Sequence, residues 1–240
     1  MSGHSKWNSI KHKKALTDAK RGKILTKHSK LLIISGRSDS NPETNATLRS
    51  AIQNAKADNV PNDNIERILK KLSGTDKGGA QITEQIYEGF GPEGIPFIVT
   101  ALTDNPNRTM PAVRTAFIKN GGNFGSSGSV MFMFNHLGVI TIKNGGKKED
   151  DLFELAVGSG ADDFSYNPEE SEVITKFSDL AKVRNALEEQ GIEIVKASPE
   201  YRAKDPKIIT ENILEKIEKL IEAVEEVEDT DEVFGGFDIN

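Results

Sequence analysis

The hydrophobic period of this 240-residue chain changes across residues 75–80, and that change limits what the chain can fold into. Before this polar, glycine-rich stretch, apolar residues recur with the 3.6-residue period of amphipathic helices. After it, short apolar runs alternate with helical segments, as in sheet domains covered by helices. The stretch itself has the composition of a linker. The sequence therefore predicts a helical domain followed by mixed sheet domains.

Three helices are predicted before the linker. The first starts at Thr17 or Asp18, either of which caps a helix, and runs to about Ser35. The second covers 45–58 and the third 62–74, with a turn at 39–43 before the second and Val60-Pro61 ending it. Residues 1–16 show no period and contain helix-breaking residues, which favours an extended arm. These elements form a predicted helical nucleic-acid-binding domain, residues 1–75.

The rest of the chain is predicted to form two sheet domains. The expected strands are 82–90, 95–102, 129–134, 136–143, 162–166, 172–175, 192–197, 200–204 and 233–239, and the expected helices are 107–119, 148–158, 178–190 and 210–227. The order within 136–198 is βαββαβ, the ferredoxin-like order. Residues 80–134 and 200–240 would form one domain split around it. The predicted fold class is α+β: an N-terminal three-helix domain, then two ferredoxin-like α/β domains, the third inserted in the second.

Charge is distributed unevenly along this sequence. Residues 1–37 hold ten basic residues and one acid, a net charge of +9. The whole chain has a net charge of −6, so the remainder carries −15. A cationic leading segment on an anionic body predicts a polyanionic partner for that segment.

The candidate nucleic-acid contacts all lie in this cationic segment. A stripe of lysines on the first helix has little acid nearby, so a phosphate backbone would relieve its repulsion and release counterions. A solvated helix face is the alternative. Trp7 could stack on a base or anchor the arm on the helices behind it. The candidate residues are Lys6, Trp7, Lys11, His12, Lys13, Lys14, Lys20, Arg21, Lys23 and Lys27.

Two glycine-rich stretches resemble phosphate-binding motifs. Gly89-Phe-Gly91-Pro-Glu-Gly94 matches G-x-G-x-x-G, but an apolar strand-like run follows it where the mechanism needs a helix. We expect a loop between two strands. The second stretch, 121–128, follows a helix and precedes a strand, so a structural turn is favoured over a phosphate cradle. Residues 104–109 are expected to cap a helix, with Arg108 a weak candidate for an anion contact.

Several functional classes find no support in the composition. The chain has no cysteine, so no thiol-based zinc site is possible. His4 and His12 lie on the arm without carboxylates, and His28 lies on an apolar helix face, so no metal is expected. No local catalytic arrangement, cofactor motif, small-molecule site or membrane-length apolar run is present. We expect a cytoplasmic protein that is not an enzyme. The acidic segment 211–232 reads as an amphipathic helix with a solvated face that repels nucleic acid.

Several motifs resemble those of the YebC family of bacterial proteins. They are Met1-Ser-Gly-His-Ser-Lys-Trp7 with Ile10-Lys-His12, Asp18-Ala-Lys-Arg-Gly-Lys23, Asp63-Asn-Ile-Glu-Arg67, Tyr87-Glu-Gly-Phe-Gly-Pro92, Thr103-Asp-Asn-Pro-Asn-Arg-Thr109, and Gly121-Gly-Asn123 with Gly128-Ser-Val130. The resemblance runs nearly end to end. It implies three domains, one helical and two α/β.

The resemblance also implies a function, because members of that family are described as transcriptional regulators that bind DNA. Relatives that include mitochondrial translational activators act instead with the ribosome, notably where proline-rich sequences stall it. Charge does not separate DNA from ribosomal RNA as the partner, because both polymers present phosphates. A long cationic arm and the lack of an evident helix-turn-helix suit an irregular RNA surface. Both hypotheses stay open at this point.

Overall fold

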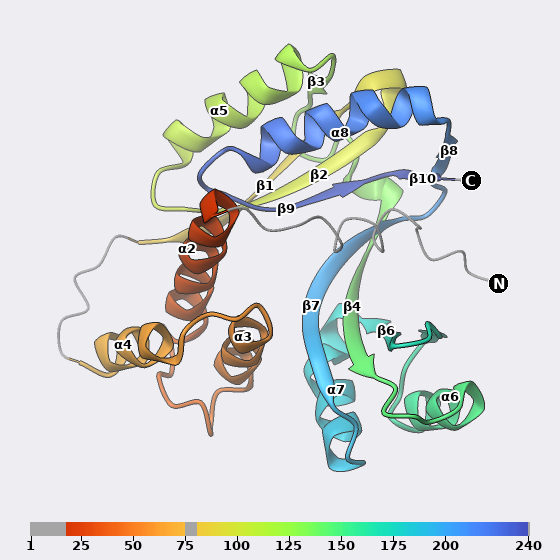
Figure 1. The fold of residues 1–240 in the computed structure, drawn as a ribbon. Coiled ribbons are helices and arrows are strands. Elements are labelled where there is room, and N and C mark those ends of the chain that lie inside the picture. Colours follow the sequence, from red (N-terminus) through yellow and green to blue (C-terminus); the bar gives the residue numbers. More distant parts are fainter. Residues whose placement is uncertain (1–17, 75–80, 240) are drawn as a thin grey trace. The chain divides into compact units, whose positions relative to one another are not determined.

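The computed structural model describes residues 18–74 and 81–239, with side chains from Arg21 onward, so the predicted arm of residues 1–16 lies outside the described residues. The described residues have a mixed α+β fold with three helices first, as predicted (Figure 1). These helices are α2 (Asp18–Ser35), α3 (Ala46–Ala57) and α4 (Asn62–Ser73). The chain divides into two compact units, and α2 contributes to both, with its division at Lys30 and Leu31. The predicted three-domain boundaries stay a prediction.

The first unit contains the start of α2, the segment that ends at Asn135 and the segment from Tyr201 onward. Its sheet has the order β3-β1-β2-β9, so a strand from the end of the chain pairs with strands that precede the insertion. The elements are β1 (Thr83–Phe90), β2 (Pro96–Thr103), α5 (Pro106–Lys119), β3 (Asn123–Phe124), β8 (Lys207–Ile209), α8 (Glu211–Glu225), β9 (Thr230–Gly235) and β10 (Phe237–Ile239). β8 and β10 form a separate parallel pair.

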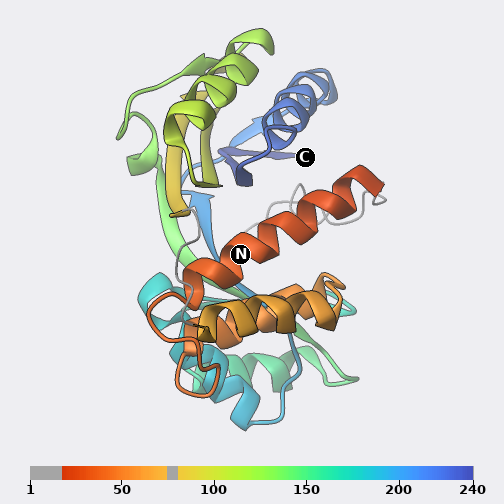
Figure 2. The same ribbon diagram turned by 90° about the vertical axis from the view of Figure 1, so that its left-hand side faces the viewer.

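One face of the first sheet carries the main core of this unit. Figure 2 shows α5 and α8 side by side over that face, and both helices bury apolar residues against it. Phe97 on β2 is fully buried and packs edge-on to Phe117 of α5, with ring centroids 6.3 Å apart. The opposite face has its own small cluster around Ile98, Val130 and Phe134. Both faces of β2 are therefore covered, which explains why all eight of its residues are buried.

The second unit contains α3, α4 and the inserted sheet domain. The chain order of that domain is βαββαβ, as predicted, and its sheet has the order β5-β6-β4-β7. Its elements are β4 (Phe134–Lys143), α6 (Glu149–Gly158), β5 (Asp163–Ser165), β6 (Glu170–Lys176), α7 (Leu180–Glu189) and β7 (Ile194–Ala203). The first and last of these strands begin or end in the first unit.

Buried polar contacts fasten α3 to the inserted domain within this second unit. Arg184 on α7 is 1% exposed and donates to Ser50 and Gln53 of α3. Asn54 of α3 exchanges two hydrogen bonds with the backbone of Ala197 on β7, at 2.8 and 3.1 Å. These side chains satisfy donors and acceptors that burial would otherwise leave unpaired. The helical and inserted segments of this unit therefore pack as one body.

Four predicted strands are wrong in detail. Residues 131–133 form a 3-10 turn in place of the predicted strand 129–134, and β4 begins only at Phe134. The predicted strands 192–197 and 200–204 are one strand, β7. The predicted strand 233–239 is interrupted after β9, where Gly236 bonds through its amide to the carbonyl of Pro96, 2.8 Å away. That hydrogen bond continues the pairing of β9 with β2, and the chain then enters β10, which pairs with β8 instead.

The G-x-G-x-x-G stretch covers the end of β1 and the loop to β2, close to the predicted loop, with a 3-10 turn at Pro92–Gly94. Its first two glycines are required for space. A Cβ on Gly89 would lie 2.7 Å from the carbonyl oxygen of Asn123, and one on Gly91 would lie 2.5 Å from the ring of Phe97. The motif therefore permits close packing between this loop and its neighbours.

Replacing Gly89 by alanine is expected to lower the free energy of unfolding by about 1–3 kcal/mol, because a backbone carbonyl yields little to an added methyl. Gly158, at the end of α6, is the control, since a Cβ there meets nothing within 4 Å. The G158A variant should unfold at the wild-type urea concentration or slightly above it. Equal midpoints for G89A and wild type would contradict the packing argument.

Candidate nucleic-acid interface

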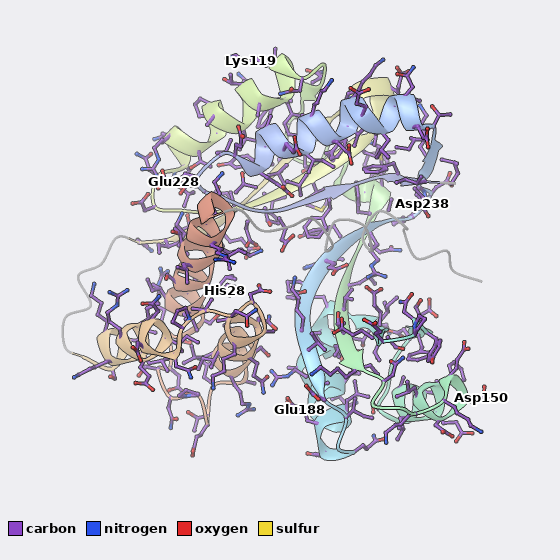
Figure 3. All side chains as sticks on the ribbon, in the orientation of Figure 1. His28, Lys119, Asp150, Glu188, Glu228 and Asp238 are labelled. Carbon is purple, nitrogen blue, oxygen red and sulfur yellow. The ribbon has the colours of Figure 1, made fainter. Side chains whose placement is uncertain are left out.

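The structure describes part of the predicted basic surface. Lys6, Trp7, Lys11, His12, Lys13 and Lys14 lie outside the described residues, and Lys20 lies in the first turn of α2, before the described side chains. Arg21 and Lys23 are exposed, whereas Lys27 is partly buried. His28 lies on the apolar side of α2 and is buried, with an exposed fraction of 2% (labelled in Figure 3). The prediction that His28 is a core residue is therefore confirmed.

The lysines of α2 contact acidic and carbonyl groups of the same unit. The ammonium of Lys27 lies 2.6 Å from a carboxylate oxygen of Glu232 and 3.0 Å from one of Asp231, both on β9. The Lys23 ammonium donates to the backbone carbonyl of Glu225, at the end of α8, over 3.0 Å. The charge of Lys27 is therefore compensated within the fold, whereas the carbonyl contact of Lys23 leaves its positive charge in place.

Lys27 is held in its charged form by this arrangement. Burial alone would lower the pKa of its ammonium, but the nearby carboxylates of Glu232 and Asp231 outweigh burial and raise that pKa well above its usual value. The stabilisation that this charge contributes is therefore fully present below the unfolded pKa of about 10.4. It is lost only as the pH rises through the raised pKa of the folded state.

Asp229, in the turn before β9, is the centre of a second polar cluster. Its carboxylate lies 2.7 Å from the ammonium of Lys30 and 2.9 Å from the guanidinium of Arg108. The hydroxyls of Thr103 and Thr109 donate to it over 3.1 and 2.7 Å. With an exposed fraction of 4%, this carboxylate is a buried anion that depends on these four donors. The sequence makes Arg108 a candidate contact for an external anion, but its guanidinium already pairs with the buried carboxylate of Asp229.

The same donors set the charge state of Asp229. Burial alone would raise its pKa, but hydrogen bonds from Lys30, Arg108 and Thr109 outweigh burial and hold that pKa far below its usual range. The carboxylate of Asp229 is therefore ionised near neutral pH. Sequence reasoning missed this cluster, because its members come from α2, β2, α5 and the turn before β9.

The end of the glycine-rich turn at 121–128 and the residues after it donate backbone amides to a carboxylate of the protein itself, that of Glu88. The carboxylate of Glu88, on β1, accepts hydrogen bonds from the amides of Gly128, Val130 and Met131 at 2.6, 2.7 and 2.8 Å. Glu88 is 4% exposed. These amides are therefore not available to a phosphate, and their use explains why residues 131–133 leave the strand conformation.

Replacing Glu88 by glutamine is expected to lower the free energy of unfolding by about 1.5–3 kcal/mol, because the amide loses the charge that three N–H donors require. Burial alone would raise the pKa of Glu88, but these backbone amides lower it. The wild-type contribution is thus present above an unfolded pKa of about 4.3 and is lost as the pH falls through the lowered pKa. Urea unfolding at neutral pH measures the effect.

Glu84, four residues earlier on the same strand, is the matched control for that variant. Burial and the negative charge of Asp231 raise its pKa, so neutralising it removes an unfavourable interaction. We expect E84Q to be as stable as wild type or slightly more stable. An equal loss in E84Q and E88Q would show that the amides around Glu88 contribute nothing specific.

No set of three or more histidine, cysteine, aspartate or glutamate side chains suited to a metal ion occurs among residues 21–74 and 81–239. His4 and His12 lie outside that range. Within the part of the chain that the structure describes, no helix is long and apolar enough to cross a bilayer. In the polar clusters described above, charged side chains of the protein pair with one another.

Comparison with known proteins identifies the family. Residues 5–75 match the TACO1/YebC protein N-terminal domain, and residues 82–237 match the TACO1/YebC second and third domain. A "probable transcriptional regulatory protein" of Thermoanaerobacter pseudethanolicus is 44% identical over 241 residues, which cover 100% of this chain and 98% of that protein. One of the same name from Corynebacterium glutamicum is 42% identical, covering 100% and 96%.

A solved structure agrees with these sequence matches. The crystal structure of a conserved hypothetical protein from Aquifex aeolicus superposes with a TM-score of 0.86 at 40% identity, and the match covers 98% of each chain. The sequence motifs from Met1 to Val130 that resemble the YebC family are thus accompanied by the same fold. On both grounds, the chain belongs to the TACO1/YebC family.

Proposed function

We propose that the protein is a cytoplasmic, non-enzymatic regulator of transcription that binds DNA through the cationic segment from Lys6 to Lys23. The observation that carries the proposal is the concentration of charge: residues 1–17 hold four lysines and no acid, within a chain of net charge −6. Such a segment gains affinity by releasing the counterions of a phosphate backbone. The names of the relatives, as transcriptional regulatory proteins, support the regulatory part.

The internal contacts of α2 refine which cations serve this function. Lys27 and Lys30 are engaged by carboxylates at 3.0 Å or less, so using them for DNA would require breaking those pairs. Arg21 and Lys23 are exposed at the start of the described part of the helix, and Lys23 would exchange its hydrogen bond to the carbonyl of Glu225 for a phosphate without breaking an ion pair. The proposed surface is therefore the arm with Lys20, Arg21 and Lys23, and the proposal gives Lys27 a structural role. Phosphate contacts alone position a protein without specifying a sequence.

A competition experiment tests the proposal. The intact protein is mixed at fixed salt with a labelled promoter duplex, and unlabelled random duplex or purified ribosomes are added. A transcriptional regulator is expected to prefer the promoter over the random duplex by about tenfold or more, a preference that requires base contacts in addition to the proposed phosphate contacts. Ribosomes should compete for the protein no better than random duplex does at an equal concentration of phosphate. Co-sedimentation with ribosomes that survives excess DNA would overturn the transcriptional proposal in favour of a role in translation.

A further inference from the structure

An exposed apolar patch lies on the inserted domain, away from the cationic segment in sequence. Phe153 and Val157, one turn apart on α6, are 52% and 53% exposed. The ring of Phe164 on β5 packs edge-on to Phe153, with centroids 6.2 Å apart. Tyr166, two residues further on, is 36% exposed. Adjacent exposed aromatic and aliphatic side chains of this kind mark interaction surfaces more often than isolated ones do.

The core cluster of the inserted domain does not include Phe153 or Val157. The opposite side of α6 buries Leu152 and Ala156 completely in the core cluster of that domain. Phe153 and Val157 therefore remain exposed after the helix has already buried its packing face. Leaving a phenylalanine half in water forgoes part of the roughly 1.5–3 kcal/mol that its burial offers.

The charge around the patch is mostly negative, with Lys147 and Lys148 just before α6. Residues 149–175 contain nine acids and no lysine or arginine. On α6, Glu149 and Asp150 lie one turn before Phe153, Glu154 lies one turn before Val157, and all three are exposed. Asp150 is labelled on this helix in Figure 3. No ion pair joins these three carboxylates to any residue within 21–74 or 81–239. The patch is therefore an apolar centre with an acidic rim.

We infer that this face of α6 and β5 docks a basic segment of a partner protein, one that presents lysine or arginine side chains around an apolar anchor. Nucleic acid is disfavoured, because the acidic rim repels phosphates. A basic protein segment suits both parts: its charges pair with the rim, its aliphatic stems cover the apolar centre, and an arginine or lysine packs over the exposed ring of Phe153. This role is additional to the proposed DNA contact and uses a different part of the chain.

The test uses the intact protein and a labelled amphipathic peptide of leucine and lysine, with a leucine–glutamine peptide as the uncharged comparison. Fluorescence anisotropy at fixed salt gives the affinities. We expect the glutamine peptide to bind about tenfold more weakly, and the F153S/V157S and D150N/E154Q variants each to weaken binding of the lysine peptide about tenfold. DNA affinity of these variants should stay at the wild-type value.

Two matched variants keep the inference falsifiable. I118S/I208S removes two exposed apolar side chains, 60% and 55% exposed, outside the patch. E211Q/E226Q removes two exposed charges at the ends of α8. Both should bind the lysine peptide within about twofold of wild type. Equal losses in patch and control variants, or no loss in either, would overturn the inference. Self-association of the wild type that F153S/V157S abolishes would also overturn it, by assigning the face to a second copy of this chain.

Discussion

Replacing Asp229 by alanine will lower the free energy of unfolding by about 3–5 kcal/mol, the range for removing one partner from a buried ionic cluster. The substitution leaves the ammonium of Lys30 without its carboxylate, and the guanidinium of Arg108 keeps only Asp104, at the surface. The hydroxyls of Thr103 and Thr109 lose their acceptor as well. Urea unfolding followed by circular dichroism at neutral pH measures the difference.

Asp205, an exposed residue in the turn between β7 and β8, is the control for that experiment. Removing its carboxylate should change stability by less than about 0.5 kcal/mol. The wild-type cluster also has a pH signature. Because the pKa of Asp229 is lowered in the folded state, its contribution is complete above the unfolded pKa of about 3.9 and is lost as the pH falls through the lowered pKa. The free energy of unfolding of D229A should therefore fall less steeply with acid than that of the wild type. Parallel curves of stability against pH for the two proteins would contradict the account.

Neutralising three arm lysines in the K11A/K13A/K14A variant will weaken binding to a random duplex on the order of a hundredfold at about 50 mM salt, since each lost phosphate contact forfeits its counterion release. The thermal midpoint should not change, because the sequence predicts that these lysines lie on an extended arm outside the helical core. Electrophoretic mobility shift and calorimetry measure the two quantities. The K56A/K70A/K71A variant is the control, since it removes the same charge from exposed positions on α3 and α4.

That control is expected to bind DNA within about threefold of wild type, the change that a long-range field of three charges produces at moderate salt. A hundredfold loss in both variants would mean that overall charge governs binding and that the arm has no special role. A loss in neither would remove the arm from the interface.

Much of the fold was predictable because local residue patterns specify it. Asn45 and Asn105 cap α3 and α5 through side-chain hydrogen bonds to the amides of Leu48 and Arg108, at 3.0 and 3.2 Å. The βαββαβ order of the inserted domain follows from periods that repeat within a few residues. Such signals need no knowledge of the rest of the chain. They placed the helices to within a residue or two.

The features that could not be predicted depend on contacts between distant segments. Residues 129–134 have the composition of a strand, yet Glu88, about forty positions earlier, binds the amides of Val130 and Met131. The lysine stripe of α2 looked uncompensated because the acids that pair with it follow some two hundred positions later, on β9 and the turn before it. The only local hint was the shortage of acids within the helix itself, which requires a partner of some kind but does not say which.

The most direct test of the account measures how the affinity for a random duplex depends on salt, for the wild type and for a variant with Lys6, Lys11, Lys13 and Lys14 changed to alanine. The account predicts that the slope of log affinity against log salt concentration becomes shallower by about 3.6 in the variant, since each phosphate contact contributes roughly 0.9. Identical slopes for the two proteins would contradict the claim that the leading segment binds the phosphate backbone.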